Sequence, residues 1–206
     1  MAQPSDPTGG ARTPVVLIAD RVVDGTGRPA IEDAAVVIDG EQIVAVGNVS
    51  EITQSVPATV PRLVYPGCTI LPGLIDCHVH LTFSAGRMIR HDVQTDSDAR
   101  MIMRATVNAR EALLAGVTTV RDLGGRGRLT LEFRDAVAEG LIPGPRVLAT
   151  GRPITIPDGH LHFLGGVATG VAGVTALAEE LVEEGVDAIK VMATGGGLTK
   201  DGPAIW

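Results

Sequence analysis

The chain has 206 residues, of which 45% are apolar and 20% charged, a balance typical of globular proteins with a buried core and not of disordered chains. Its net charge of −7 and its aromatic content of 2% argue against nucleic acid as a partner, since nucleic-acid binding requires a basic surface and, for single strands, stacking side chains. No stretch approaches the roughly 20 apolar residues of a membrane span. We therefore expect a cytoplasmic protein without a membrane partner.

The first 66 residues predict a tail followed by a small β domain. Residues 1–12 are polar, lack the apolar segment of a signal peptide and predict a flexible tail. Residues 13–66 alternate short β-branched segments with Asp-Gly turns, and Asp39-Gly40 between two apolar runs is a strong hairpin signal. Three prolines within 47–66 should interrupt regular structure and end this sandwich-like domain. It contains no histidine, so we place no chemistry in it.

Residues 67–206 predict alternating strands and helices. Gly116, Gly140 and Gly185 each precede a β-branched run, which is typical of a helix followed by a strand of a parallel sheet. The predicted strands are 74–80, 117–121, 146–150 and 187–192. Apolar residues at helical spacing predict the buried faces of the three intervening helices: Ile102, Thr106, Ala109 and Leu113; Leu129, Phe133 and Val137; Val174, Leu177 and Leu181. The fold class is therefore α/β. We expect the first four units of a TIM (β/α)8-type barrel, incomplete in this chain because a whole barrel takes about 250 residues.

The first of these strands carries a candidate metal site. In a strand, alternate side chains share a face, so Asp76, His78 and His80 should point the same way. Two imidazoles on one face can bind a single zinc or similar divalent ion. Taken alone, a His-x-His pair is a weak signal, and two polar residues at the end of a strand are the commoner explanation. Asp76 lies deeper, where we expect it to hydrogen-bond to a histidine.

Further candidates follow the later strands, because the carboxyl ends of barrel strands form the reactive face. Arg121 and Asp122 end the second strand, and we expect a structural hydrogen-bonded pair. His160 and His162 lie in the loop after the third strand; for His162, packing beneath the loop is as plausible as a role in the site. Lys190 lies among apolar residues that disfavour its charge, although a lysine reaching from the strand end to water would fit as well.

Five phrases resemble one known family. Residues 71–81, Leu-Pro-Gly-Leu-Ile-Asp-Cys-His-Val-His-Leu, resemble the metal-binding first barrel strand of the amidohydrolase superfamily. Val-Arg-Asp-Leu-Gly-Gly at 120–125 and Ile-Lys-Val-Met-Ala-Thr-Gly-Gly-Gly at 189–197 resemble its second and fourth strands. Together with 151–155 and 159–163, they are similar to the N-terminal half of the prolidase-like branch, the Xaa-Pro or Xaa-Arg dipeptidases. Leu161 departs from that branch, which has glycine at this position.

The resemblance implies a metal-dependent hydrolase acting on the amide bond of a dipeptide or an N-acyl amino acid through a metal-bridging hydroxide. It assigns His78 and His80 to one Zn²⁺ and a carboxylated Lys190 to the bridge with a second, although other divalent metals use the same groups. It assigns His160 to substrate binding. It also requires histidines on strands five and six and an aspartate on strand eight. We find no catalytic residue of this kind in the chain, and expect the isolated chain to be inactive.

Two alternatives remain open. A mononuclear deaminase or a relative of imidazolonepropionase also uses His-x-His, but has no bridging lysine. A truncated, non-catalytic fragment would require a second half of the barrel, because unpaired strand edges favour association with a complementing C-terminal half or with another copy as a homo-oligomer.

Overall fold

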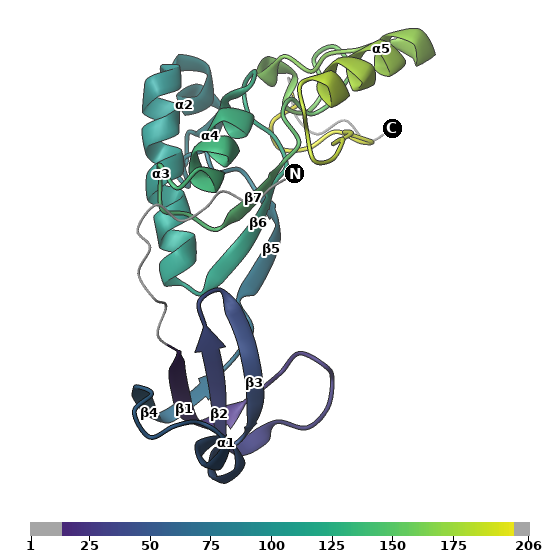
Figure 1. Ribbon diagram of the computed structural model, residues 1–206. Helices are drawn as coiled ribbons and strands as arrows, with labels where there is room; N and C mark the ends of the chain where they lie inside the picture. The colour runs from purple at the N-terminus through teal and green to yellow at the C-terminus, as the bar shows by residue number, and fades with distance from the viewer. Residues whose placement is uncertain (1–13, 200–206) are drawn as a thin grey trace. The chain divides into compact units, whose positions relative to one another are not determined.

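The computed structural model describes residues 14–199, and these divide into two compact units between Pro72 and Gly73 (Figure 1). The first unit holds one four-stranded sheet in the order β3-β2-β1-β4. Its strands are Val15–Val22 (β1), Ile31–Asp39 (β2), Gln42–Asn48 (β3) and Arg62–Ile70 (β4). The predicted hairpin is confirmed: β2 and β3 are antiparallel, and Asp39 pairs with Gln42 across a turn in which Gly40 has φ of 60°.

Pro57 and Pro61 lie outside helices and strands, as predicted, but the expectation that prolines interrupt regular structure is wrong for Pro66. Helix α1, Val49–Ser55, follows β3, and β4 runs parallel to β1 with Pro66 inside it. β4 is an edge strand, where a residue without an amide proton is tolerated. A register shift after Ala19 marks a bulge in β1, and the Asp20 carboxylate there accepts a hydrogen bond from the Gly67 amide at 3.1 Å.

The second unit contains a three-stranded parallel sheet, β5-β6-β7, as predicted for the start of an α/β barrel. Its strands are Leu74–Val79 (β5), Val117–Asp122 (β6) and Arg146–Ala149 (β7). The helices are Ile89–Thr95 (α2), Asp98–Leu114 (α3), Leu129–Ala138 (α4) and Gly170–Glu183 (α5), and a short 3-10 helix covers His162–Leu164. Helices α3 and α4 lie against the same side of the sheet in Figure 1. No described helix is long and apolar enough to cross a membrane.

The fourth strand, predicted over 187–192, is not formed as such. Val191 makes one isolated parallel bridge with Ile154, and the amides of Asp187 and Met192 donate to the carbonyls of Ala149 and Ile154 at 2.9 Å each. Residues 187–192 thus run parallel to β7 and the residues after it, but the hydrogen bonds between them are not continuous as in a sheet. The Ile154 amide also donates to the Lys190 carbonyl at 2.8 Å, so separate hydrogen bonds at Ala149 and Ile154 hold the Lys190 region.

The helix faces are only partly as predicted. Ala109, Phe133, Leu177 and Leu181 are buried, whereas Val174 is 37% exposed. On α3 the buried side chains are Met101, Ala105 and Ala109, so its core-facing stripe runs next to the predicted one. Ala105, Ala109, Leu131 and Phe133 pack against Val120 and Val147 of the sheet, which fixes β6 and β7 relative to α3 and α4.

Candidate active site

One cavity of about 230 Å³ brings together the histidines and the lysine predicted from separate parts of the chain. His78 and His80 reach it from β5, His160 from the loop after β7, and Lys190 from the segment that bridges to Ile154. Residues 191–196 complete its lining. The topology therefore assembles groups separated by more than a hundred residues, because the carboxyl ends of the parallel strands open on one edge.

Strand β5 holds the two imidazoles close to each other. The ring centroids of His78 and His80 are 5.5 Å apart with an interplanar angle of 66°. His78 is exposed, while His80 is half-buried and stacks on the ring of Phe83 at 4.5 Å. The stacking restricts the His80 ring, and sequence reasoning missed it. The sequence does place an aromatic residue three positions after His80, at the spacing of a turn. In the structure this turn forms, and the Phe83 amide donates to the His80 carbonyl at 3.0 Å.

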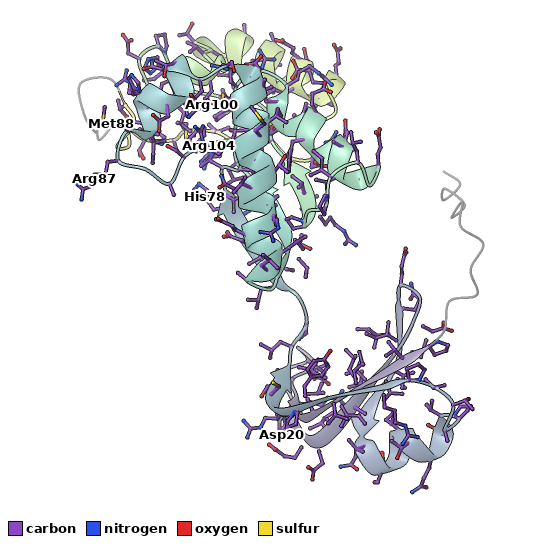
Figure 2. The ribbon with its side chains drawn as sticks, turned by 90° about the vertical axis from the view of Figure 1, so that its left-hand side faces the viewer. Asp20, His78, Arg87, Met88, Arg100 and Arg104 are labelled. Atoms are coloured by element: carbon purple, nitrogen blue, oxygen red, sulfur yellow. The ribbon has the colours of Figure 1, made fainter. Side chains whose placement is uncertain are left out.

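Side chains of α3 hold the backbone immediately after β5. The Asn108 amide group donates to the carbonyls of Leu81 and Phe83 at 2.7 and 3.0 Å, and the Arg104 guanidinium donates to the carbonyl of Thr82 at 3.2 Å. Figure 2 shows Arg104 on the helix beside the strand that carries His78. Leu81, Thr82 and Phe83 are buried, and their carbonyls find these partners instead of water. The end of β5 is therefore a fixed support for His80.

His80 and His160 have backbone partners of opposite kinds. Nδ1 of His80 lies 2.9 Å from the Gly124 carbonyl oxygen, which can only accept, so Nδ1 carries the proton and Nε2 keeps its lone pair. Nδ1 of His160 instead accepts from the Leu198 amide at 3.2 Å, so in the neutral ring the proton is on Nε2. His80 is thereby suited to ligate a metal ion, and His160 to donate a hydrogen bond.

The surroundings of both rings favour the neutral form. Burial lowers the pKa of His80 below its ordinary value, the Gly124 hydrogen bond opposes this, and repulsion from the Lys190 ammonium group lowers the pKa further. Burial and then the charge of Lys190 lower the pKa of His160, against a backbone hydrogen bond to Gly196. Neutral imidazole is the form that binds metals.

Asp122 is placed differently from our expectation, and the predicted pair with Arg121 is wrong. Adjacent residues of a strand point to opposite faces. Arg121 is exposed and its Nε donates to the Cys77 carbonyl at 3.0 Å, whereas Asp122 is fully buried and accepts from the amides of Leu81 and Gly124 at 2.9 and 3.0 Å. Burial raises the pKa of Asp122 to about 7, although these two hydrogen bonds act in the other direction.

Two further expectations are settled by hydrogen bonds. Asp76 accepts from the backbone amide of His78 at 3.0 Å, so this hydrogen bond supports the histidine's backbone and not its imidazole. His162 Nδ1 lies 2.8 Å from the Gly159 carbonyl oxygen, its ring meets Phe163 edge-on, and it does not line the cavity. His162 therefore shapes the loop that presents His160. Between them, Leu161 adopts φ of 61° and is 1% exposed.

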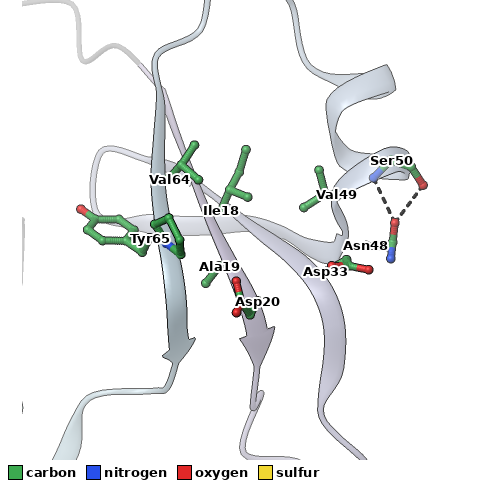
Figure 3. A pocket seen from close by; sticks show the side chains of 10 residues that line it. Ile18, Ala19, Asp20, Asp33, Asn48, Val49, Ser50, Val64 and Tyr65 are labelled. Atoms are coloured by element: carbon green, nitrogen blue, oxygen red, sulfur yellow. Dashed lines mark hydrogen bonds between the residues drawn. The ribbon is translucent and has the colours of Figure 1, made fainter.

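A larger hollow of about 480 Å³ lies on the sheet of the first unit (Figure 3). Its polar groups serve the fold: Asn48 caps α1 by accepting from the amide and hydroxyl of Ser50 at 3.0 and 2.8 Å, and Asp20 binds the Gly67 amide. Its lining has no histidine or lysine. The functional cavity is therefore the one with His78, His80, His160 and Lys190.

The residues present fit part of a metal centre. Two imidazoles and an amine border the cavity, and the protonation of His80 leaves Nε2 as a donor atom. Within residues 14–199, no group of three or more His, Cys, Asp or Glu side chains converges to hold a metal ion. The described donors would thus need further ligands, either from a modified Lys190 or from elements outside these residues.

Comparison with known proteins finds sequence similarity to one family over most of the second unit. The model of the amidohydrolase family matches residues 69–204. The chain is 27% identical over 214 aligned residues to ochratoxinase of Aspergillus niger, covering 90% of this chain and 43% of that protein. It is 30% identical over 183 residues to imidazolonepropionase of Paenarthrobacter aurescens strain TC1, covering 87% of this chain and 41% of that one.

The fold is shared with solved structures. A Xaa-Pro dipeptidase with methionine bound in its active site is 26% identical, with a TM-score of 0.76, covering 89% of this chain and 48% of that one. The chain thus spans less than half the length of the curated relatives described above. Its three strands and their helices correspond to part of a TIM-barrel-like fold.

Proposed function

The chain belongs to the amidohydrolase family, and from this membership we propose that it forms the metal-binding half of an enzyme that hydrolyses the amide bond of a dipeptide or an N-acyl amino acid. The observation that carries the proposal is the cavity in which His80 has a free Nε2 lone pair beside His78, Lys190 and His160. The similarity to a Xaa-Pro dipeptidase supports the dipeptide class.

In this proposal His78, His80 and Lys190 hold two zinc ions, with Lys190 carboxylated. Divalent ions held there would lower the pKa of water and polarise the amide carbonyl. Manganese, cobalt or iron would use the same donor types. Carboxylation would convert the single nitrogen of Lys190 into an anionic group with two oxygens, enough to join two ions that the imidazoles alone cannot both satisfy. The half-buried position of Lys190 in the cavity lining supports this role.

We assign His160 to substrate binding. Its neutral ring presents the Nε2 proton, since Nδ1 accepts from the Leu198 amide. A donor at that position suits a carbonyl or carboxylate oxygen of a dipeptide. Burial lowers the pKa of His160, so the neutral ring orients the substrate oxygen without exchanging a proton with it.

A second half of the barrel would complete the site. Within the described residues β5 pairs with β6 alone, and Leu74 and Ile75 are 50% and 66% exposed. Such an open edge favours pairing with a complementing segment or a second copy. Size-exclusion chromatography with light scattering should find that isolated 1–206 self-associates. A protein that also contains the barrel strands found in the uncovered half of the relatives should elute as one species of constant mass.

The decisive experiment is hydrolysis of a panel of dipeptides and N-acyl amino acids by zinc-loaded protein. We expect turnover from a chain that includes the complementing strands and none from 1–206 alone. Turnover by 1–206 would contradict the requirement for a second half. Absence of turnover with every amide substrate in the completed protein would contradict the proposed function.

The similarity to imidazolonepropionase supports a second candidate, a mononuclear enzyme that needs no carboxylated lysine. Mass spectrometry of the native protein in bicarbonate buffer separates the two. Addition of one carbon dioxide to Lys190, lost in Lys190→Arg, supports the dinuclear dipeptidase. An unmodified Lys190 in an active, metal-loaded protein supports the mononuclear enzyme.

A further inference from the structure

Asp122 is a buried ionisable group to which the proposed function gives no task. It is fully buried at the end of β6, and among the described residues no Arg or Lys side chain forms an ion pair with it. Burying a carboxylate without a cation is costly unless hydrogen bonds compensate. Here both oxygens accept backbone amides, Oδ2 from Leu81 and Oδ1 from Gly124. The carboxylate therefore joins two loops that follow different strands.

Both of these loops support His80. Leu81 is the residue after His80, so its amide fixes the backbone that carries the imidazole. Gly124 supplies the carbonyl oxygen that accepts the Nδ1 proton of His80. One carboxylate thus sets the position of the ring and of its hydrogen-bond acceptor together.

The conformation of the loop that carries the Gly124 carbonyl is constrained by its neighbours. Gly124 has φ of 145°, and a Cβ placed there would lie 2.9 Å from Cγ of Pro153. The adjacent amides are also engaged: Leu123 donates to the Val79 carbonyl at 2.9 Å, and Gly125 to the Gly151 carbonyl at 3.0 Å. With the hydrogen bond from the Gly124 amide to Asp122, three consecutive backbone amides of this loop are held.

We infer that Asp122 is a positioning residue for the metal centre, which holds Leu81 and Gly124 so that His80 keeps its proton on Nδ1 and its lone pair on Nε2. The inference rests on the proposed function in taking His80 as a metal ligand. Asp122 itself does not line the cavity. It acts through the orientation and tautomer of His80.

The test compares wild type with Asp122→Asn in metal-free 1–206 by long-range ¹H–¹⁵N NMR of the histidine rings at pH 8, where the Asp122 carboxylate is ionised and both its oxygens can accept. Asparagine has nearly the same shape, but its one oxygen can serve only one of the two amides, and its NH₂ group faces the other donor. We expect the wild-type His80 ring to be protonated on Nδ1 and the variant to show a mixture of tautomers. Zinc affinity, measured by calorimetry, should fall about ten- to a hundredfold, the usual effect of removing a partner that orients a ligand.

Asp187→Asn is the matched control. The Asp187 carboxylate also accepts a backbone amide, that of Ala149 at 2.8 Å, but its hydrogen bonds involve neither His80 nor Gly124. This substitution should lower stability while leaving the His80 tautomer and zinc affinity at wild-type values. A folded Asp122→Asn protein with Nδ1-protonated His80 and wild-type zinc affinity would overturn the inference.

Neither the His80 tautomer nor the zinc affinity depends on hydrolysis. A failure of this inference can therefore be told apart from a failure of the proposed function. If Asp122→Asn does not fold, the wild-type spectrum still decides, because a proton on Nε2 of His80 contradicts the inference. Asp122→Ser, which keeps one acceptor, then provides the affinity measurement. Wild-type affinity in that variant counts against the inference, and reduced affinity with a mixed tautomer supports it.

Discussion

His80 and His160 border one cavity with opposite hydrogen-bond partners at Nδ1: the Gly124 carbonyl oxygen at 2.9 Å for His80, and the Leu198 amide at 3.2 Å for His160. The backbone thereby distinguishes two chemically identical side chains. One exposes a lone pair at Nε2 and the other a proton. This difference separates a candidate metal ligand from a candidate substrate donor.

The ligand assignment predicts that His80→Ala and His78→Ala each weaken zinc binding by 1–206, because each removes one imidazole from the cavity. Isothermal calorimetry should show at least a tenfold loss. His162→Ala is the control, since His162 binds the Gly159 carbonyl and lies outside the cavity lining. Equal losses in all three variants would indicate scattered surface binding.

The donor assignment predicts that Gly196→Ala displaces His160. A Cβ at Gly196 would lie 2.7 Å from Nδ1 of His160, whereas one at Gly197 meets nothing within 4 Å. The ring can move aside, so we expect a folded protein with shifted His160 NMR signals and, in the complete enzyme, a KM raised about tenfold. Gly197→Ala should match wild type in both measurements. Unchanged His160 signals in Gly196→Ala would contradict the placement of this loop.

The buried carboxyl predicts a pH-dependent difference between wild type and Asp122→Asn. The pKa of Asp122 is raised from 3.8 to about 7 in the folded chain, so between these values the folded state holds a proton that the unfolded state has lost. The contribution of Asp122 to stability is therefore fully present below 3.8 and declines as pH rises to about 7, by up to about 1.4 kcal/mol per pH unit. The asparagine variant lacks this term.

Urea unfolding of both proteins between pH 4.5 and 8 measures the difference in unfolding free energy. The lowered pKa of His160 reduces stability at acidic pH in both proteins, so its effect cancels in that difference. Because Asp122→Asn also disturbs His80, the comparison is repeated in a His80→Ala background, which removes the His80 contribution from both proteins. A difference that is constant across the range would show that Asp122 stays ionised in the folded chain.

Two substitutions of Leu161 measure the effects of backbone strain and of side-chain packing on stability separately. Its φ of 61° is unfavourable for leucine, and its side chain is 1% exposed against Phe83, Met101 and Leu164. Leu161→Ala should lower the unfolding free energy by about 2–5 kcal/mol through the lost packing. Leu161→Gly should recover about 1 kcal/mol of that loss, because glycine adopts positive φ without strain. A glycine variant less stable than the alanine variant would contradict the strained backbone.

Local signals predicted the elements on which the site is built. Glycine followed by a β-branched run located β6 and β7, and the alternation around His78 and His80 placed both imidazoles at the end of β5. Other features depend on partners distant in sequence. The partners of Asp122 are Leu81 and Gly124, whereas the sequence offered its neighbour Arg121. Pro66 is tolerated in β4 only because β4 is an edge strand, a fact of sheet order that no local window contains.

The central claim is that His78, His80 and Lys190 together hold divalent metal. Anomalous diffraction at the zinc edge, from crystals of the protein grown with zinc and bicarbonate, measures this directly. The account predicts a peak about 2.0–2.1 Å from imidazole nitrogens of both His78 and His80, with density continuous from Nζ of Lys190. A zinc peak away from these rings, or a Lys190 side chain turned out of the cavity, would contradict it.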